Sequence, residues 1–185
     1  MPFIRTVEYS DADENLKQVY DELIESRGKL AEVHKIQSLN PEALTAHMDL
    51  YMTVMFGKSP LKRYQREMMA VIVSSVNRCF YCINHHEQAL LAYWKDENRV
   101  ESLRIDRKKA GLSDQDERLC SLAEKLTKNP SARFSESISE LKSAGLNDRA
   151  VLDAVQVIAY FNFVNRMVLG LGAEFTEEEM KGYHY

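Results

Sequence analysis

Apolar residues recur along the chain at the three- and four-residue intervals of amphipathic helices, and no run alternates between apolar and polar positions as a half-buried strand would. Only seven glycines and four prolines interrupt this pattern. Capping residues and helix breakers divide the chain into about eight predicted helices. Their approximate ranges are 10–27, 41–57, 60–75, 79–94, 96–110, 113–129, 135–145 and 147–172. The pattern predicts an all-α fold.

Two kinds of start signal define the first three predicted helices. A polar residue at position 10 or 11 is expected to cap the first helix. The dipeptides Asn40-Pro41 and Ser59-Pro60 each combine a capping side chain with a proline at the first helical position. We therefore predict that the second and third helices start directly after Asn40 and Ser59.

Two segments, Met68–Val73 and Ala150–Leu171, are apolar almost all the way round the helix. Helices of this kind lie at the centre of a bundle or in a subunit interface. We expect one domain over residues 1–185, with an N-terminal arm and helix (1–40) and a helical core (41–185). Because a monomer of this length has little surface with which to cover two such helices, a homo-oligomer is expected.

Composition excludes several classes of function. The net charge is −4 and basic residues form no stripe with aromatic ones, so no nucleic-acid partner is expected. No apolar run has the length of a membrane span, and the first residues lack the apolar core of a signal peptide. We expect a cytoplasmic protein with no membrane partner. In a reducing compartment, a close cysteine pair is more often catalytic or metal-binding than structural.

The stretch "CFYCINHH" (79–86) carries the chemistry. On a helix, Cys79, Cys82 and His86 fall at positions i, i+3 and i+7 of one stripe, whereas His85 lies to its side and Tyr81 points away. The start of a helix offers unpaired N–H groups and the positive end of the dipole, and both favour thiolate over thiol. An imidazole one turn away can take up the proton.

Two other interpretations of the cysteine pair remain open at this point. A zinc site would need a fourth ligand, and no second pair of ligands has the usual spacing; the candidates are His34, His47, His184 and Cys120. Alternatively, the two cysteines are small core residues. A thioredoxin-like fold is not expected because the βαβ context is missing.

Glu67 precedes the wholly apolar run "MMAVIV" on the helix that leads into the cysteine pair. A buried carboxylate needs partners, or its pKa rises. Two antiparallel helices joined by a short turn near Val76–Arg78 would bring Glu67 close to His86 or Cys82.

The order Glu67, eleven residues, Cys79, two residues, Cys82, three residues, His86 resembles the signature of the alkylhydroperoxidase D family, within the carboxymuconolactone decarboxylase superfamily. Three further stretches are similar to its branch of uncharacterised peroxidase-related enzymes: "SLNPEALTAHMDLYMTVMFG", "CFYCINHH" and "AYFNFVNRMVLGLG". The resemblance implies a multi-helix bundle with the CxxC motif at the start of a helix.

The resemblance also implies roles for the four residues. Glu67 and His86 would form a proton relay, Cys82 would attack the peroxide and Cys79 would resolve the product. The family needs no flavin, haem or metal, but an external dithiol or redox protein must regenerate the pair. This chain departs from the best-studied members in carrying Tyr81 where they have a histidine. The decarboxylases of the superfamily lack the cysteine pair, so this chain is not expected to be one.

The leading hypothesis is thus a thiol-dependent peroxidase for organic hydroperoxides or hydrogen peroxide. The alternatives are a general thiol–disulfide oxidoreductase and a non-catalytic helical subunit with a zinc-binding or structural cysteine pair. Asn162, Asn165 and Arg166 share one face of an apolar helix and are interpreted as a structural network or subunit contact. "SVNRC" (75–79) and "FVNRM" (163–167) each follow an apolar run and hint at a repeat, although three shared letters are weak support.

Overall fold

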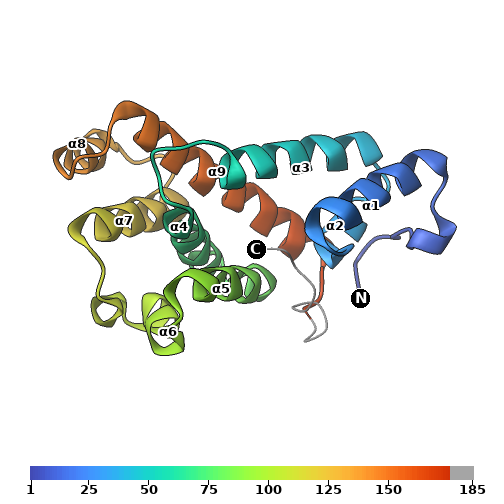
Figure 1. The fold of residues 1–185 in the computed structure, drawn as a ribbon, viewed down its shortest axis with the longest axis horizontal. Helices are drawn as coiled ribbons and strands as arrows, with labels where there is room; N and C mark the ends of the chain where they lie inside the picture. Colours follow the sequence, from blue (N-terminus) through green and yellow to red (C-terminus); the bar gives the residue numbers. More distant parts are fainter. Residues whose placement is uncertain (176–185) are drawn as a thin grey trace.

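The computed structural model describes residues 1–175, which form nine α-helices and two short 3-10 helices (Figure 1). The elements are η1 (Tyr9–Asp11), α1 (Glu14–Arg27), α2 (Glu32–Lys35), α3 (Pro41–Phe56), α4 (Arg63–Val76), α5 (Phe80–Trp94), α6 (Glu97–Ile105), η2 (Arg107–Ala110), α7 (Asp114–Lys128), α8 (Ser135–Ser143) and α9 (Asp148–Leu171). No residue from 1 to 175 is in a strand, which confirms the predicted all-α fold.

The start of α3 is as predicted, because Pro41 is its first residue and the Asn40 side chain accepts a hydrogen bond from the N–H of Ala43. The predicted start of α1 is wrong. Residues 9–11 form η1 instead, and the Asp13 side chain caps α1 by accepting from the N–H of Leu16. A capping side chain acts only where the following N–H groups are unpaired, so η1 moves the cap along the chain.

The predicted start of α4 is also wrong, since the helix begins at Arg63. The Ser59 hydroxyl donates to the Asp153 carboxylate at 2.5 Å and accepts from the N–H of Leu61. Ser59 therefore connects the α3–α4 loop to α9 rather than capping a helix.

Two further elements differ from the expectation. The four-residue helix α2 is too short to show a periodic pattern and was not predicted. The segment 96–110, expected to be one helix, is divided into α6 and η2, with Val100 and Leu103 buried against the core. Charged residues on the remaining positions conceal this short apolar side.

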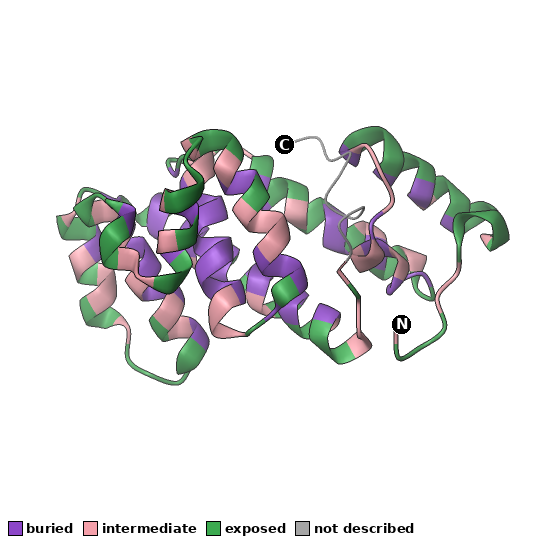
Figure 2. Cartoon of the chain, turned by 90° about the horizontal axis from the view of Figure 1, so that it is seen from below, coloured by how far each residue is buried: buried purple, intermediate pink, exposed green. Residues whose placement is uncertain are grey.

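Helix α4 lies at the centre of the bundle, and every residue from 65 to 74 on it is buried. It packs against α5, α7 and α9, and Figure 2 shows this buried segment between the surrounding helices. The predicted burial of Met68–Val73 is confirmed. The polar side chains within residues 65–74, such as those of Glu67 and Ser74, must therefore have their hydrogen-bond partners inside the protein.

Helix α9 is buried on one side only. Its inner residues pack on α3, α4 and α7, whereas Leu152, Phe163 and Leu169 on the other side are exposed. By length and composition, α9 alone among the described helices could cross a membrane, but core helices of globular proteins meet the same criterion. The predicted burial of Ala150–Leu171 is therefore confirmed only for the side of α9 that packs against the other helices.

Helices α1 and α3 form a smaller second cluster at the other end of the elongated molecule (Figure 1). Leu16, Tyr20 and Leu23 of α1 pack on Leu44 and Met48 of α3. Gly28 ends α1 in the left-handed conformation, with φ of 86°, where a residue without Cβ is favoured. Arg27, the last residue of α1, lines the cavity that lies between the two clusters.

A three-residue turn, Asn77 to Cys79, connects α4 to α5. Arg78 adopts the left-handed conformation with φ of 57°, which a non-glycine residue occupies only at a cost. The turn leaves Cys79 as the N-cap residue of α5 and Cys82 in its first turn. The predicted position of the CxxC motif at the start of a helix is confirmed.

Candidate active site

A carboxylate at the centre of the bundle organises the candidate site. Glu67 on α4 is completely buried, and its two oxygens have different partners. Oε1 accepts from the Arg63 guanidinium one turn earlier on α4, and Oε2 accepts from His86 Nδ1 of α5 at 2.6 Å. The predicted proximity of Glu67 and His86 is confirmed.

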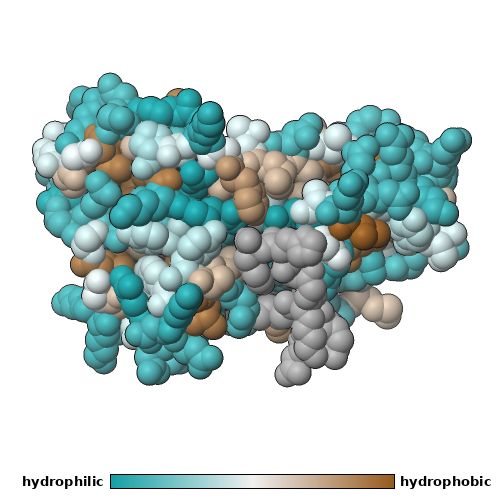
Figure 3. All heavy atoms as spheres, in the orientation of Figure 1, coloured by the Kyte–Doolittle hydropathy of each residue, from teal (hydrophilic) through white to brown (hydrophobic). Residues whose placement is uncertain are grey.

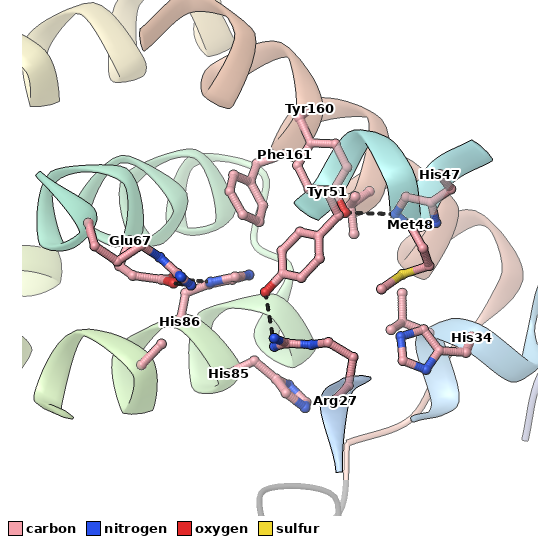
Figure 4. Close-up of a pocket in the computed structure, with 14 residues that line it drawn as sticks. Arg27, His34, His47, Met48, Tyr51, Glu67, His85, His86, Tyr160 and Phe161 are labelled. Atoms are coloured by element: carbon pink, nitrogen blue, oxygen red, sulfur yellow. Dashed lines mark hydrogen bonds and ion pairs between the residues drawn. The ribbon is translucent and has the colours of Figure 1, made fainter. Parts of the chain in front are cut away.

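These partners keep Glu67 ionised. Burial by itself would raise the pKa of the carboxyl, but His86 and Arg63 together outweigh this effect and lower the pKa below its ordinary value. Since His86 Nδ1 donates to the carboxylate, Nε2 of the neutral ring is left as a hydrogen-bond acceptor. Figure 4 shows the His86 ring extending from α5 into the pocket.

The two cysteines are both buried thiols, and their sulfur atoms lie 2.6 Å apart. The pKa of Cys79 is lowered because its sulfur interacts with the Cys82 thiol and with the backbone N–H of Cys82, although burial acts in the opposite direction. The pKa of Cys82 is raised well above its ordinary value, chiefly by burial and by its contact with Cys79. The resting pair therefore holds any negative charge at Cys79 and the proton at Cys82.

A buried amide also acts on the pair. Asn165 of α9 is fully buried, and its side-chain amide, near the Cys82 sulfur, opposes the rise in the pKa of Cys82. Its Nδ2 also donates to Ser74 Oγ at 3.2 Å, and its Oδ1 accepts from Asn77 Nδ2 at 3.0 Å. Because Oδ1 is bonded to Asn77, Nδ2 is the atom of the amide that is available to Cys82.

The predicted network on α9 extends further than its own helix. Asn162 accepts from Asn77 at 3.1 Å and donates to Thr127 of α7 at 3.0 Å, and Arg166 donates back to Asn162. The network therefore joins α7 and α9 to the turn before Cys79. Sequence reasoning grouped Asn162, Asn165 and Arg166 correctly but gave Asn165 no connection to the cysteines.

A cavity of about 80 Å³ lies between the two clusters of the fold, and Figure 4 shows the side chains that line it. Glu67 and His86 contribute to it from α4 and α5, and Arg27 and Tyr51 from α1 and α3. Neither cysteine lines the cavity. Tyr160, which does, has its pKa raised mainly by burial and, to a smaller extent, by the nearby Cys82. Cys82 is thus close to the cavity wall.

Two other histidines of the cavity are neutral. Burial lowers the pKa of His34 to about 3 and that of His47 to about 4. His47 Nδ1 lies 3.0 Å from Gln37 Oε1, and the Tyr160 hydroxyl donates to Nε2 at 2.7 Å. These contacts assign one tautomer to His47 and leave it no part in proton transfer at neutral pH.

The side chains next to the predicted site residues have structural partners. The Tyr81 hydroxyl accepts from the N–H of Val33, and its ring stacks on His85 with centroids 4.3 Å apart. His85 lies off the stripe of the sulfurs, as predicted, but it still lines the cavity. Cys120, a candidate zinc ligand in the sequence, is completely buried in the main core cluster.

The structure gives no support to a zinc site. Within residues 1–175, no three or more histidine, cysteine or acidic side chains are grouped so that they could hold a metal. The candidate ligand His184 lies outside the described residues.

Two residues of the site, Arg63 and Arg27, were not predicted from the sequence. The i, i+4 spacing of Arg63 and Glu67 was an available signal, whereas the contacts of Arg27 come from distant segments.

Comparison with known proteins agrees with this fold. Residues 41–123, which contain all four predicted site residues, match the carboxymuconolactone decarboxylase family. An uncharacterized protein of Bacillus subtilis (strain 168), YdfG, is 25% identical over 132 residues, which are 71% of this chain and 88% of YdfG.

Solved structures show the same architecture. An uncharacterized peroxidase-related protein from Silicibacter sp. TM1040 is 29% identical with a TM-score of 0.83, covering 92% of this chain and 91% of that one. A second, described as an alkylhydroperoxidase AhpD core from Ralstonia eutropha JMP134, is 21% identical with a TM-score of 0.86, covering 97% and 94%. The debrominase Bmp8, solved in complex with 2,3,4-tribromopyrrole, is 18% identical with a TM-score of 0.80, covering 96% and 93%.

Fold and site together define an all-α protein of the alkylhydroperoxidase D-like type. The chain resembles the carboxymuconolactone decarboxylase family over residues 41–123, and the solved structures similar to it include peroxidase-related proteins. Members of the superfamily are enzymes, among them AhpD and a debrominase.

Glu67→Gln should destabilise the protein by about 3 kcal/mol at pH 7, because it leaves the partly buried Arg63 guanidinium without its counter-charge and weakens the bond to His86. The pKa of Glu67 is lower in the folded protein than its ordinary 4.5, so its stabilisation is complete above that pH and is lost as the pH falls through the folded-state pKa. Urea unfolding at several pH values should show the difference from wild type shrinking in acid. The surface change Glu140→Gln is the control, and a deficit independent of pH would contradict the charge argument.

Asn165→Leu should make Cys82 less reactive, because the thiolate loses the amide that donates to it. With Cys79 and Cys120 replaced by serine, the rate of Cys82 alkylation by iodoacetamide at pH 8 should fall roughly tenfold, the equivalent of one charge-assisted hydrogen bond. Asn162→Leu disturbs the same network without a contact to the sulfur and should have a smaller effect. Equal rates in the two variants would assign Asn165 to packing alone.

Proposed function

We propose that the protein is a thiol-dependent peroxidase that reduces hydrogen peroxide or organic hydroperoxides. The observation that carries the proposal is the juxtaposition of two sulfurs 2.6 Å apart with His86, one helical turn after Cys82 and hydrogen-bonded to the buried Glu67. A peroxidatic thiol needs a proton acceptor and a second thiol nearby, and this arrangement supplies both.

In the first step, the Cys82 sulfur loses its proton and attacks the outer oxygen of the hydroperoxide. The O–O bond breaks, Cys82 becomes a sulfenic acid and the inner oxygen leaves as an alkoxide, or as hydroxide from hydrogen peroxide. We assign two steps to His86: its Nε2 takes up the proton released when Cys79 ionises, and it then delivers this proton to the leaving oxygen, while Glu67 stabilises the charged ring in between. An alcohol or water is the product.

In the second step, Cys79 condenses with the sulfenic acid, so that a disulfide forms and water is released. The contact between the sulfurs supports this step, because little movement is needed for the bond to form. An external dithiol then reduces the disulfide through a mixed disulfide and is itself oxidised. The proposal requires no flavin, haem or metal in these steps.

The choice of Cys82 as the attacking sulfur rests on position rather than on resting charge. The lowered pKa of Cys79 puts the thiolate there at rest. Transfer of the shared proton from Cys82 to Cys79, over the short contact, produces a Cys82 thiolate beside Asn165 and near the cavity wall. Cys79 then holds the proton that leaves with the water of the second step.

One observation favours the second candidate, a general thiol–disulfide oxidoreductase. Phe80, between the two cysteines, is 71% exposed, and an exposed aromatic side chain beside a CxxC pair suits contact with a protein partner. The same feature serves the proposed peroxidase, since its dithiol reductant could be a redox protein. Decarboxylation is not proposed, because the chain carries the cysteine pair that the decarboxylases lack.

Single cysteine variants test the mechanism. Cys82→Ser should abolish peroxide consumption with a dithiol reductant and leave no sulfenic acid at Cys79. Cys79→Ser should also stop turnover but react once, and a dimedone-type probe detected by mass spectrometry should label Cys82, because no thiol resolves it. Labelling of Cys79 in Cys82→Ser, with no labelling of Cys82 in Cys79→Ser, would mean that Cys79 attacks the peroxide and Cys82 resolves the product. Unchanged peroxide consumption in both variants would reject the peroxidase altogether.

The adjacent histidines provide a matched control for the relay. His86→Ala should shift the rate of the single reaction of Cys79→Ser to higher pH, since the proton acceptor is gone. His85 lines the same cavity, but its ring is bonded to the Tyr81 carbonyl and not to Glu67. His85→Ala should therefore shift the pH dependence of this reaction less.

We also propose that the protein is a homo-oligomer. Exposed apolar side chains on α3 (Leu50, Phe56) and α9 (Leu152, Phe163, Leu169) support it, and Figure 3 shows apolar surface over the region of α3. Such a surface is typical of a protein interface. Light scattering at micromolar concentration should report more than one subunit, and Phe163→Glu should shift the mass toward the monomer. A wild-type protein that is monomeric throughout would refute this.

A further inference from the structure

Arg27, the last residue of α1, is a buried cation without a buried anion. It is 6% exposed, and no carboxylate in residues 1–175 forms an ion pair with it. Its Nη2 donates to the Tyr51 hydroxyl at 3.3 Å, and its guanidinium lies 5.2 Å from the centre of the Tyr51 ring and 4.9 Å from that of Phe56. Aromatic rings support a guanidinium but do not neutralise its charge.

The same guanidinium belongs to the cavity of the candidate site. Arg27 lines it together with Glu67 and His86, and Figure 4 shows the Arg27 side chain reaching beneath the Tyr51 hydroxyl toward the histidines of α5. A buried arginine ordinarily has a carboxylate or phosphate on its planar edge, where it can donate two parallel hydrogen bonds. In this cavity that edge has no such group among the described residues.

The charges that line the cavity do not balance. Arg27 and Arg63 are cationic, and among the residues of 1–175 that line the cavity Glu67 is the one carboxylate. Glu67 is already held by Arg63 and His86, so it is not available to Arg27. His34 and His47 are neutral, His85 adds no negative charge, and the buried Nε of Arg63 has no hydrogen-bond partner among residues 1–175. A ligand that carries one negative charge would restore the balance.

We infer that Arg27 and Tyr51 form an anion-binding subsite and that the substrate is a short hydroperoxide bearing a carboxylate. This inference deepens the proposed peroxidase and rests on it for the hydroperoxide; the anion subsite rests on Arg27 alone. The carboxylate lies on Arg27 at the α1–α3 side of the cavity, and the peroxide group lies toward His86 on α5. Apolar side chains such as Val33, Met48 and Val164 also line the cavity and suit a hydrocarbon linker.

The size of the cavity favours a short substrate. About 80 Å³ accommodates roughly six water molecules, which corresponds to a molecule with a few carbon atoms rather than a long acyl chain. Monoperoxysuccinate carries a peroxy acid and a carboxylate at opposite ends of such a chain. Peracetic acid has the same reactive group without the carboxylate and is uncharged at pH 6.5, so the two form a matched pair of probes.

The experiment measures kcat/KM for both probes with a dithiol reductant at pH 6.5. We expect Arg27→Gln to lower the ratio of monoperoxysuccinate to peracetic acid at least tenfold, because only the first probe uses the guanidinium. Arg118→Gln, which removes an exposed arginine outside the cavity, should keep the wild-type ratio. Calorimetry with succinate, which has no peroxide group, should show binding to wild type that weakens at least tenfold in Arg27→Gln.

These readouts separate the two proposals. Succinate binding that depends on Arg27, without consumption of either peroxide, would reject the peroxidase and retain the anion subsite. Consumption of both probes with a ratio unaffected by Arg27→Gln, and no Arg27-dependent succinate binding, would overturn the subsite alone. If Arg27→Gln does not fold, succinate should inhibit peracetic acid consumption by wild type at concentrations at least tenfold lower than neutral succinamide. Equal inhibition by the two would overturn the inference.

Discussion

One buried charge determines how the helices around the site are arranged. Glu67 lies in the completely buried part of α4, where an unpaired carboxylate would be costly, so a hydrogen-bond donor must reach each of its two oxygens. Arg63 comes from the same helix, one turn away, and His86 comes from α5. The second bond holds α5 against α4 in one register, and that register places the first turn of α5, with both sulfurs, beside Asn165 of α9. Structure and candidate chemistry thus depend on the same ion pair.

Much of this arrangement could be predicted from short-range patterns. Periodicity and capping gave the helices, and the spacing of Cys79, Cys82 and His86 along a single helix gave one functional stripe. The apolar run after Glu67 indicated a central helix, and a short turn to the next helix then made the contact with His86 predictable. Each of these inferences uses residues that are close in sequence, where helix geometry fixes the positions in space. The errors at the starts of α1 and α4 have different origins: η1 moves the cap of α1 to Asp13, and Ser59 is bonded to Asp153 of the distant helix α9 instead of capping α4.

The rest could not be predicted because it depends on distant segments. Asn165 reaches Cys82 only when α9 packs on α4 and α5, and Arg27 reaches the cavity only when α1 packs on α3. The similar stretches "SVNRC" and "FVNRM" illustrate this limit. Their asparagines, Asn77 and Asn165, are hydrogen-bonded to each other across 88 positions of sequence, so a resemblance too short to interpret coincided with a contact. Polar residues in apolar helices show that partners exist, but the sequence does not name them.

The site separates three tasks among three surfaces of α5 and its neighbours. The cavity, lined by His86, receives the small molecule, whereas the sulfurs lie behind its wall and the exposed Phe80 faces outward from the same helical turn. A thiolate shielded in this way is protected from indiscriminate reaction, since oxidation of a cysteine follows its exposure and its ionisation. The raised pKa of Cys82 adds to this protection at rest, and the proton that it shares with Cys79 can be moved without bringing water to either sulfur. Burial therefore limits the reactivity of the cysteine pair, and the buried polar groups on α4, α5 and α9 permit a thiolate to form within it.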